Sequence, residues 1–316
     1  MADPDVMAPR PLAAGIFFHE WCLLALGTGT LGALLARAGP HAPVAWETAA
    51  ATAGYGVLVL GLRGRNPLAR RLSYLMAYGY ILWFYLAVVR ITPALGTTPR
   101  DRALCALDRA ILGETPAVLW QNYTRPWLTD LFSAAYLGYL AYLHVALGCA
   151  FVAPIASLHR LAAPLFGAFA AGLLGYLLVP ALGPAVAHPD AFAAPLTGGA
   201  LTWINDLVVS HGSSRYDVFP SLHVLITCVL LDHDYRAAPR RFLLMLLPAG
   251  LLFASTLYLR YHYAIDLAAA FALFLTLCGL RRLLHKPAAR ASGAAAPASI
   301  RAEDHGLAAT SGACRT

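Results

Sequence analysis

Residues 161–182 read LAAPLFGAFAAGLLGYLLVPAL and contain no charged side chain. A helix that crosses the hydrocarbon core of a bilayer needs about 20 mostly apolar residues, so this stretch predicts a membrane span. Comparable stretches recur along the 316 residues, of which 59% are apolar and 12% charged, and the mean hydropathy is +0.62. Soluble domains average about 45–50% apolar and about 25% charged residues. The composition therefore excludes an ordinary soluble or disordered protein and predicts a polytopic membrane protein.

Eight stretches of the chain are candidate membrane spans. They cover residues 16–36, 44–62, 72–92, 130–153, 161–182, 219–232, 242–259 and 263–280. The sixth is short for a full crossing. We predict an all-α integral membrane helix bundle of about eight spans.

The distribution of arginine and lysine predicts the orientation of these spans, because basic residues of short loops concentrate on the cytoplasmic side. With the N-terminus inside, that side receives the basic loops 63–71 and 236–241 and the residues after the last span. Both termini are therefore expected in the cytoplasm. Segments 93–129 and 184–218 and the turn near Arg260 are expected on the opposite side. The net charge of +7 follows from this topology, so no nucleic-acid partner is expected.

Composition also divides the chain into regions. Residues 1–15 are polar and predict an N-terminal cytoplasmic segment, and residues 16–92 hold the first three spans. Residues 93–284 hold the membrane core that contains the candidate catalytic residues. Residues 285–316 are rich in alanine, serine, glycine and proline, which predicts a disordered cytoplasmic tail.

Segment 93–129 predicts a short amphipathic helix in the headgroup region. Leu104, Leu107, Ile111 and Leu112 recur at helical spacing, and tryptophan and tyrosine residues follow them. Aromatic side chains are enriched at the interface between membrane and water. The helix is expected either to brace the membrane surface or to contribute to a site, and the pattern leaves both open.

The six cysteines indicate neither a disulfide framework nor a zinc site. They contain no CxxC pair and lie mostly within apolar runs, where cysteine is a small core residue. We also find no carboxylate cluster suited to a metal ion, so no metal and no cofactor is expected.

A first candidate site is Phe219-Pro220-Ser221-Leu222-His223, which opens the short sixth span. Proline is tolerated in the first helical turn, and the backbone N–H groups that follow it, Leu222 included, form an anion site at the positive end of the helix dipole. Ser221 adds a hydroxyl donor, and His223 is placed to deliver a proton. A capped helix with an interfacial histidine is the simpler alternative.

A second candidate site is the stretch STLYLRYHYAID at residues 255–266. His262 and Asp266 are four residues apart, so on a helix the carboxylate lies one turn below the imidazole. Asp266 can then accept from one ring nitrogen and leave the other free to attack. An aspartate in a lipid-facing helix is costly, so Asp266 is expected to face the protein interior. A purely structural pair is the alternative.

The two sites are expected at the same non-cytoplasmic face. Two histidines, one of them oriented by a carboxylate, with arginine nearby, suit phosphoryl transfer through a phosphohistidine. One imidazole attacks the phosphorus, and the other protonates the leaving oxygen.

On these residues the chain resembles the type 2 phosphatidate phosphatase superfamily, over roughly residues 100–280. FPSLH is similar to its second motif, PSGH, and the stretch from Ser255 to Asp266 is similar to its third, SRxxxxxHxxxD. The form FPSLH followed by STx5HYxxD most closely resembles the inositol phosphorylceramide synthase branch and its bacterial relatives. The resemblance implies that His262 is the nucleophile, Asp266 its orienting partner, His223 the general acid, and Ser221 a phosphate contact.

Three departures from the family pattern remove its usual phosphate cations. Leu222 replaces the glycine of the second motif, and Thr256 replaces the arginine of the third. The first motif, KxxxxxxRP, can be laid only on Tyr176 through Gly183-Pro184, with tyrosine for lysine and glycine for arginine. A dianionic phosphate needs compensating charge when it loses water. Arg260 is the first candidate to supply it, and Arg215 is the second.

The function predicted from this pattern is that of a membrane lipid phosphatase or phosphotransferase. Its expected partners are a lipid phosphate or phosphodiester and an alcohol or water acceptor. The motif form slightly favours headgroup transfer, and simple hydrolysis of a lipid phosphate is the alternative. A non-catalytic lipid-binding or transport protein on the same fold is a further alternative, which the missing motif cations favour and the intact histidines oppose.

Overall fold

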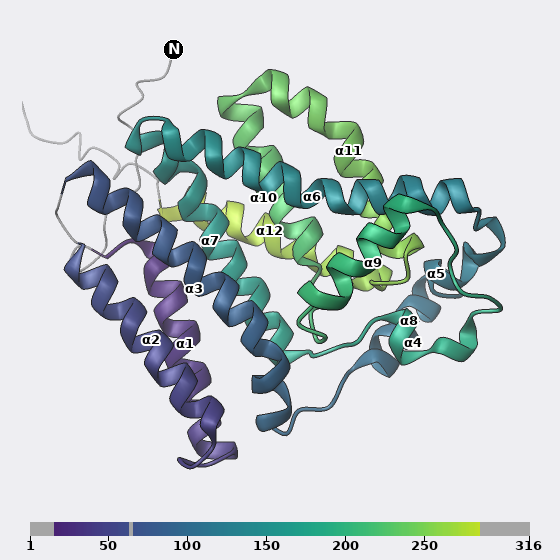
Figure 1. The fold of residues 1–316 in the computed structure, drawn as a ribbon, viewed down its shortest axis with the longest axis horizontal. Helices are drawn as coiled ribbons and strands as arrows, with labels where there is room; N and C mark the ends of the chain where they lie inside the picture. The colour runs from purple at the N-terminus through teal and green to yellow at the C-terminus, as the bar shows by residue number, and fades with distance from the viewer. Residues whose placement is uncertain (1–15, 63–65, 285–316) are drawn as a thin grey trace, which may run out of the picture.

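The computed structural model describes residues 16–62 and 66–284, and all its regular structure there is helical (Figure 1). The long helices are α1 (Phe18–Arg37), α2 (Pro43–Gly61), α3 (Pro67–Ala94), α6 (Pro126–Val152), α7 (Ile155–Leu178), α10 (Leu222–Ala237), α11 (Pro239–Tyr258) and α12 (Ala264–Leu284). The short ones are α4 (Asp101–Leu112), α5 (Pro116–Leu119), α8 (Pro184–Ala187) and α9 (Ala200–Gly212), with single 3₁₀ turns η3 (Gln121–Tyr123) and η4 (Pro189–Ala191). The all-α prediction is confirmed for these residues.

Each of the eight predicted spans overlaps one long helix. Within the described ranges, five of them are long and apolar enough to cross a membrane: α3, α6, α7, α11 and α12. These five indicate an integral membrane protein. The total of about eight spans and the orientation of the bundle stay predictions, as do the regional boundaries. The predicted cytoplasmic segment 1–15 and tail 285–316 lie outside the described residues.

The α7 helix is the centre of the bundle. It packs against α1, α3, α6 and α10, and two thirds of its apolar window is buried. Most of its own leucine, alanine and phenylalanine side chains are buried, as expected for a helix that packs against several others. It ends at Leu178, four residues before the end of the predicted span, and Val179–Leu182 continue without helix. Pro180 explains the early end, because proline disfavours helix in the residue before it.

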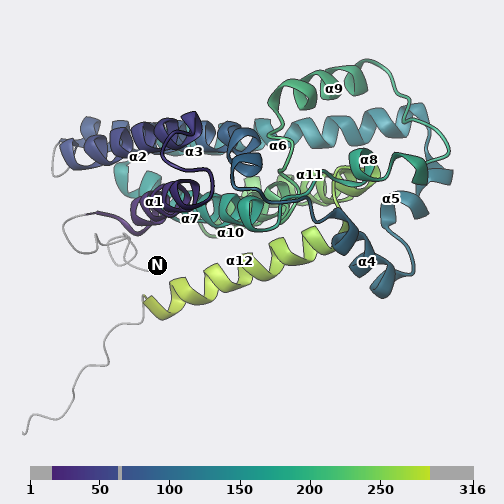
Figure 2. The same cartoon turned by 90° about the horizontal axis from the view of Figure 1, so that it is seen from below.

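The short helices gather at one end of the bundle (Figures 1 and 2). They come from the two segments 93–129 and 184–218 that arginine counting predicts to lie on one side of the membrane. The α10 start and the α11–α12 turn lie at this end too, since α12 contacts α4, and backbone hydrogen bonds join residue 185 to residue 260 and residue 221 to residue 266. The candidate catalytic residues therefore have the short helices as their cover.

Candidate active site

Three of the predicted site residues meet at this end of the bundle. Ser221 directly precedes α10, His262 lies in the turn between α11 and α12, and Asp266 belongs to the first turn of α12. The Nε2 atom of His262 lies 3.3 Å from the Ser221 hydroxyl, and its Nδ1 atom lies 3.4 Å from Oδ2 of Asp266. All three residues are buried, and His262 is only 2% exposed. The fold thus joins two motifs that are 41 positions apart.

The pairing of His262 with Asp266 differs from the helical one that the spacing predicted. The α12 helix begins at Ala264, so His262 precedes it. Oδ2 of Asp266 accepts the backbone N–H of Tyr263 at 2.7 Å, as an acid does at a helix start. This bond holds the carboxylate beside the turn, where it also faces His262. A proton on Nδ1 directed at Asp266 leaves the Nε2 lone pair free for attack.

The start of α10 also differs from the prediction. The helix begins at Leu222, so Pro220 lies before it and not in its first turn. Ser221 keeps an extended backbone because its N–H donates to the carbonyl of Asp266 at 3.2 Å. The first N–H groups of a helix have no acceptor within it, so the start of α10 still offers donors to an anion.

His223 lies on the first turn of α10, between two aromatic rings of α6. Its ring centroid is 4.5 Å from that of Tyr136 and 4.7 Å from that of Tyr139. The His223 and His262 rings are 5.8 Å apart and inclined at 69°. Nδ1 of His223 is buried without a hydrogen-bond partner among the described residues. The two imidazoles are therefore neighbours that no salt bridge or hydrogen bond joins.

The approach of α10 to α7 depends on two glycines of α7. A Cβ atom on Gly172 would overlap the side chain of Leu222, and one on Gly175 would overlap the ring of Pro220. Tyr176 follows them, is buried, and contacts the backbone of Leu222 through its hydroxyl. The position that Tyr176 occupies in the first-motif alignment is thus adjacent to the start of α10.

Arg260 is near the site but is held by the loop that follows α8. Its guanidinium donates to the carbonyl of Ala194 at 2.9 Å and stacks on the ring of Phe192 at 4.0 Å. The side chain is 7% exposed, and Nε is buried with no partner in the described part of the chain. Burial lowers the pKa of Arg260, although arginine remains charged in proteins. One donor of a desolvated cation, two residues before His262 in the chain, is therefore without a partner among the described residues.

Arg215 occupies a different environment. It lies in a left-handed turn (φ 68°) before Ser221, and its side chain is exposed, whereas Ser221, His262 and Asp266 are buried. The fold therefore places it at the surface and not among the catalytic candidates.

Two carboxylates of α4 hold the loops of the site. Asp101 is buried and accepts from the backbone N–H groups of Leu182 at 3.0 Å and Gly183 at 2.9 Å. It also accepts from the hydroxyl of Tyr263 at 3.0 Å. Through these bonds Asp101 connects the end of the segment aligned with the first motif, at Gly183, to Tyr263, the residue after His262.

Asp108, seven residues further along the same face of α4, caps α12. It accepts from the N–H groups of Ala264 and Ile265, both at 2.9 Å. Burial raises the pKa of Asp108 above its usual range, and the two backbone bonds oppose that shift. The helix of segment 93–129 is therefore more than a surface brace, since it fixes the start of the helix that carries Asp266.

No role was assigned to the two aspartates of α4 from the sequence. A signal was present, because Asp101, Leu104, Cys105 and Asp108 follow the i, i+3, i+4, i+7 spacing of one helix face, and this is the buried face. The apolar residues Leu107, Ile111 and Leu112 are exposed instead. The helix turns both aspartates and Leu104 to the protein and Leu107, Ile111 and Leu112 outward, as an interfacial helix does.

A second group that sequence reasoning missed is linked to His223 through the ring of Tyr136. The amide nitrogen of Asn205 on α9 donates to the hydroxyl of Tyr261 at 2.8 Å, and the Tyr261 ring lies 5.0 Å from that of Tyr136. These residues come from three separate elements and share no spacing, so no sequence pattern identifies them.

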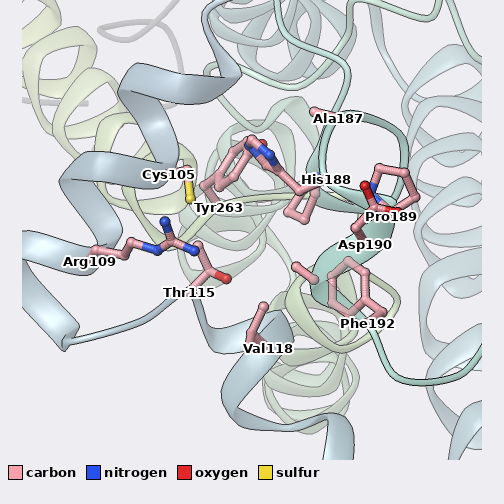
Figure 3. A pocket seen from close by; sticks show the side chains of 12 residues that line it. Cys105, Arg109, Thr115, Val118, Ala187, His188, Pro189, Asp190, Phe192 and Tyr263 are labelled. Carbon is pink, nitrogen blue, oxygen red and sulfur yellow. The ribbon is translucent and has the colours of Figure 1, made fainter.

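A cavity of about 340 Å³ lies beside this site (Figure 3). Arg109 of α4, His188 and Phe192 of the loop after α8, and Tyr263 line it. Arg109 bonds to Glu114 at 2.9 Å, and this bond lowers the pKa of Glu114. His223 and His262 are not among its lining residues, so the cavity adjoins the candidate site without containing it.

Comparison with protein families matches residues 102–280 to the PAP2 superfamily, the superfamily of type 2 phosphatidate phosphatases. The chain belongs to the PAP2 superfamily. The matched residues run from α4 through most of α12, and α1–α3 precede them. Comparisons with curated proteins and with solved structures gave no match. PAP2 enzymes are phosphatases and phosphotransferases that act on lipid phosphates, and membership implies an activity of that type for this chain.

Proposed function

We propose that this PAP2 protein transfers a phosphoryl or phospho-headgroup of a membrane lipid through a phosphohistidine on His262. The observation that carries the proposal is the pairing of two imidazole rings 5.8 Å apart, one of them facing a buried carboxylate. In-line transfer needs a nucleophile about 3 Å from phosphorus and an acid about 3 Å from the leaving oxygen. Two rings at this separation can contact opposite sides of one tetrahedral group.

In the first half-reaction, Nε2 of His262 attacks the phosphorus of the lipid. The N–P bond forms as the P–O bond to the leaving group breaks, and protonated His223 gives its proton to the departing oxygen. Asp266 stabilises the positive charge that develops on His262. The Ser221 hydroxyl, now 3.3 Å from Nε2, is expected to donate to a phosphate oxygen, together with the backbone N–H of Leu222.

In the second half-reaction, the acceptor hydroxyl attacks the phosphohistidine. Its proton passes to His223, the new O–P bond forms, and the N–P bond breaks, which restores both histidines. Arg260 is proposed to supply positive charge through its Nε atom. The hydroxyl of Tyr176, in place of the usual lysine, is proposed to hold the start of α10. Arg215 is proposed only as a surface contact for the incoming anion.

Burial of the site favours an alcohol acceptor over water. Ser221 and Asp266 are fully buried and His262 nearly so, and Asn205 of α9 donates to the hydroxyl of Tyr261, the residue before His262. A covered site limits hydrolysis of a reactive intermediate. Headgroup transfer, of the kind catalysed by inositol phosphorylceramide synthases, is therefore proposed ahead of simple phosphatase activity.

The test is turnover of labelled lipid phosphates and phosphodiesters by purified protein, with and without candidate alcohol acceptors. Wild type should form labelled phosphoprotein, and the label should disappear when an acceptor is added. His262→Ala should abolish both turnover and labelling. His223→Ala should slow labelling from lipids with poor leaving groups much more than from lipids with good ones. Labelled protein that persists in His262→Ala would refute the assignment of the nucleophile.

Arg260 is tested separately, because its loop contacts give it a structural role as well. Arg260→Lys keeps a charge but loses the stacked guanidinium, and Arg260→Ala loses both. If Arg260 binds phosphate, the alanine variant should lose well over tenfold in kcat/KM, at about 1.4 kcal/mol per decade. Equal activity of wild type and Arg260→Ala would remove this residue from the phosphate site.

A further inference from the structure

A second cavity lies at the end of the bundle opposite the two histidines. It has a volume of about 140 Å³ and is bounded by α1, α7, α10 and α12. Its walls are apolar, with Phe18, Ala163, Gly167, Val229, Phe274 and Leu277 among them. On α10, Asp232 at the cavity follows His223 by nine residues, about 14 Å along the helix axis. The cavity is therefore separate from the candidate active site.

The position of α12 opens this cavity toward the bilayer. Figure 2 shows α12 diverging from the other long helices toward its C-terminal end. Only about a tenth of its apolar window is buried, the least of the five spans. Phe274 and Leu277 on its inner side thus face Gly167 of α7 across the cavity. A hydrocarbon chain can enter such a wedge from the lipid phase without loss of protein contacts.

The mouth of the cavity is basic. Arg160 of α7 and Arg281 of α12 line it together with Asp232. Asp232 is already engaged, because Arg236 donates to it at 2.6 Å, while Arg281 lies 3.8 Å away. Arg160 donates to the neutral hydroxyl of Ser157 at 2.9 Å. Within the described ranges the mouth therefore holds the guanidinium groups of Arg160 and Arg281 and the single carboxylate of Asp232, which already accepts from Arg236, so positive charge exceeds negative charge there.

Asp232 is the one carboxylate among the described residues that line the cavity. His159 also lines the cavity, and its Nδ1 atom is hydrogen-bonded to the Tyr74 hydroxyl. A hydrocarbon-lined wedge with a basic mouth matches one kind of ligand, an acyl chain that carries an anionic headgroup. We propose that this cavity binds an anionic phospholipid of the bilayer, with part of one chain between α7 and α12 and its phosphate at Arg160 and Arg281. Arginine counting predicts that the site faces the cytoplasmic leaflet.

The experiment compares binding of phosphatidylglycerol and phosphatidylcholine with identical chains to the delipidated full-length protein, measured by native mass spectrometry. Wild type should retain phosphatidylglycerol at least tenfold more tightly than phosphatidylcholine. Gly167→Leu should lose this preference because its side chain fills the cavity while the rim charges remain. A Cβ at this position would lie 4.0 Å from Phe18, an ordinary contact, so the backbone tolerates it.

The double variant Arg160→Gln/Arg281→Gln should lose the preference as well, whereas Arg240→Gln should keep it. Arg240 is exposed at the same end of the bundle but does not line the cavity, so it is the matched control for surface charge. Equal binding of both lipids to wild type, or full retention of phosphatidylglycerol by Gly167→Leu, would overturn the proposal.

A measurement on wild type alone makes the test independent of folding in the variants. Cys278 lines the cavity, and Cys149 is exposed elsewhere. Added phosphatidylglycerol should slow alkylation of Cys278 at least fivefold, read by peptide mass spectrometry, and leave Cys149 unchanged. Equal rates at Cys278 with and without the lipid would contradict the proposed site.

Discussion

Gly183→Ala is expected to damage the active site far more than its size suggests. Gly183 has φ of +83°, and a Cβ atom there would lie 2.5 Å from the carbonyl oxygen of Tyr261, directly before His262. The left-handed backbone costs a non-glycine residue about 1–2 kcal/mol. Relief of the overlap requires a backbone shift that costs about 1–3 kcal/mol more, as overpacking does. We therefore expect a loss of about 2–5 kcal/mol in the free energy of unfolding.

The kinetic effect should exceed the effect on stability. The overlap is with backbone, so it moves the turn that holds His262, and a displacement of about 1 Å can cost about 100-fold in rate. Gly113→Ala is the matched control: Gly113 has φ of +84° with nothing within 4 Å of a Cβ atom, so it bears only the backbone cost.

The assay measures thermal unfolding in detergent and lipid phosphate turnover for both variants. Gly113→Ala should lose about 1–2 kcal/mol and keep its kcat. Gly183→Ala should unfold at a lower temperature than Gly113→Ala and lose at least tenfold in kcat. The reasoning fails if the two variants are equally stable and equally active.

Three further predictions concern the supports of the site. Asp101→Ala leaves three donors without an acceptor, at about 1–3 kcal/mol for each that stays buried, so it should lower both the unfolding midpoint and kcat. Asp130→Ala is the control, because Asp130 also accepts from two backbone N–H groups and a hydroxyl but is partly open to water. An equal fall in the unfolding midpoint of both variants would contradict the argument. The raised pKa of Asp108 means that its contribution to stability is complete below the ordinary aspartate pKa of about 3.9 and is lost as pH rises through the folded value. The unfolding midpoint of wild type relative to Asp108→Asn should therefore fall as the pH rises from about 4, and a rise would show the opposite shift. Gly175→Ala should reduce kcat by displacing Pro220, whereas Gly138→Ala, with open space at its Cβ position, should not; equal activities would remove this glycine from the packing argument.

Hydrophobic stretches and motif spacing were sufficient to predict the helices and the candidate site residues. Each of the eight apolar stretches overlaps a long helix. A long apolar segment in a bilayer must hydrogen-bond its own backbone, and a helix does so without help from neighbouring segments. The amphipathic helix at Asp101–Leu112 was expected for the same local reason. Helix ends were less accurate: Pro220 lies outside α10 and His262 outside α12, because hydrogen bonds to Asp266 hold the residues before each helix in loops.

The sequence by itself therefore determined the membrane class, the helical architecture and the identity of Ser221, His223, His262 and Asp266 as candidates, since each depends on local composition or on a short motif. Only the tertiary structure decided which groups support them. The hydrogen bonds of Asp101 to Gly183, of Asn205 to Tyr261 and of Arg260 to Ala194 join positions 56 or more apart in the chain. Such contacts follow from how helices pack, and no periodicity along one segment encodes them.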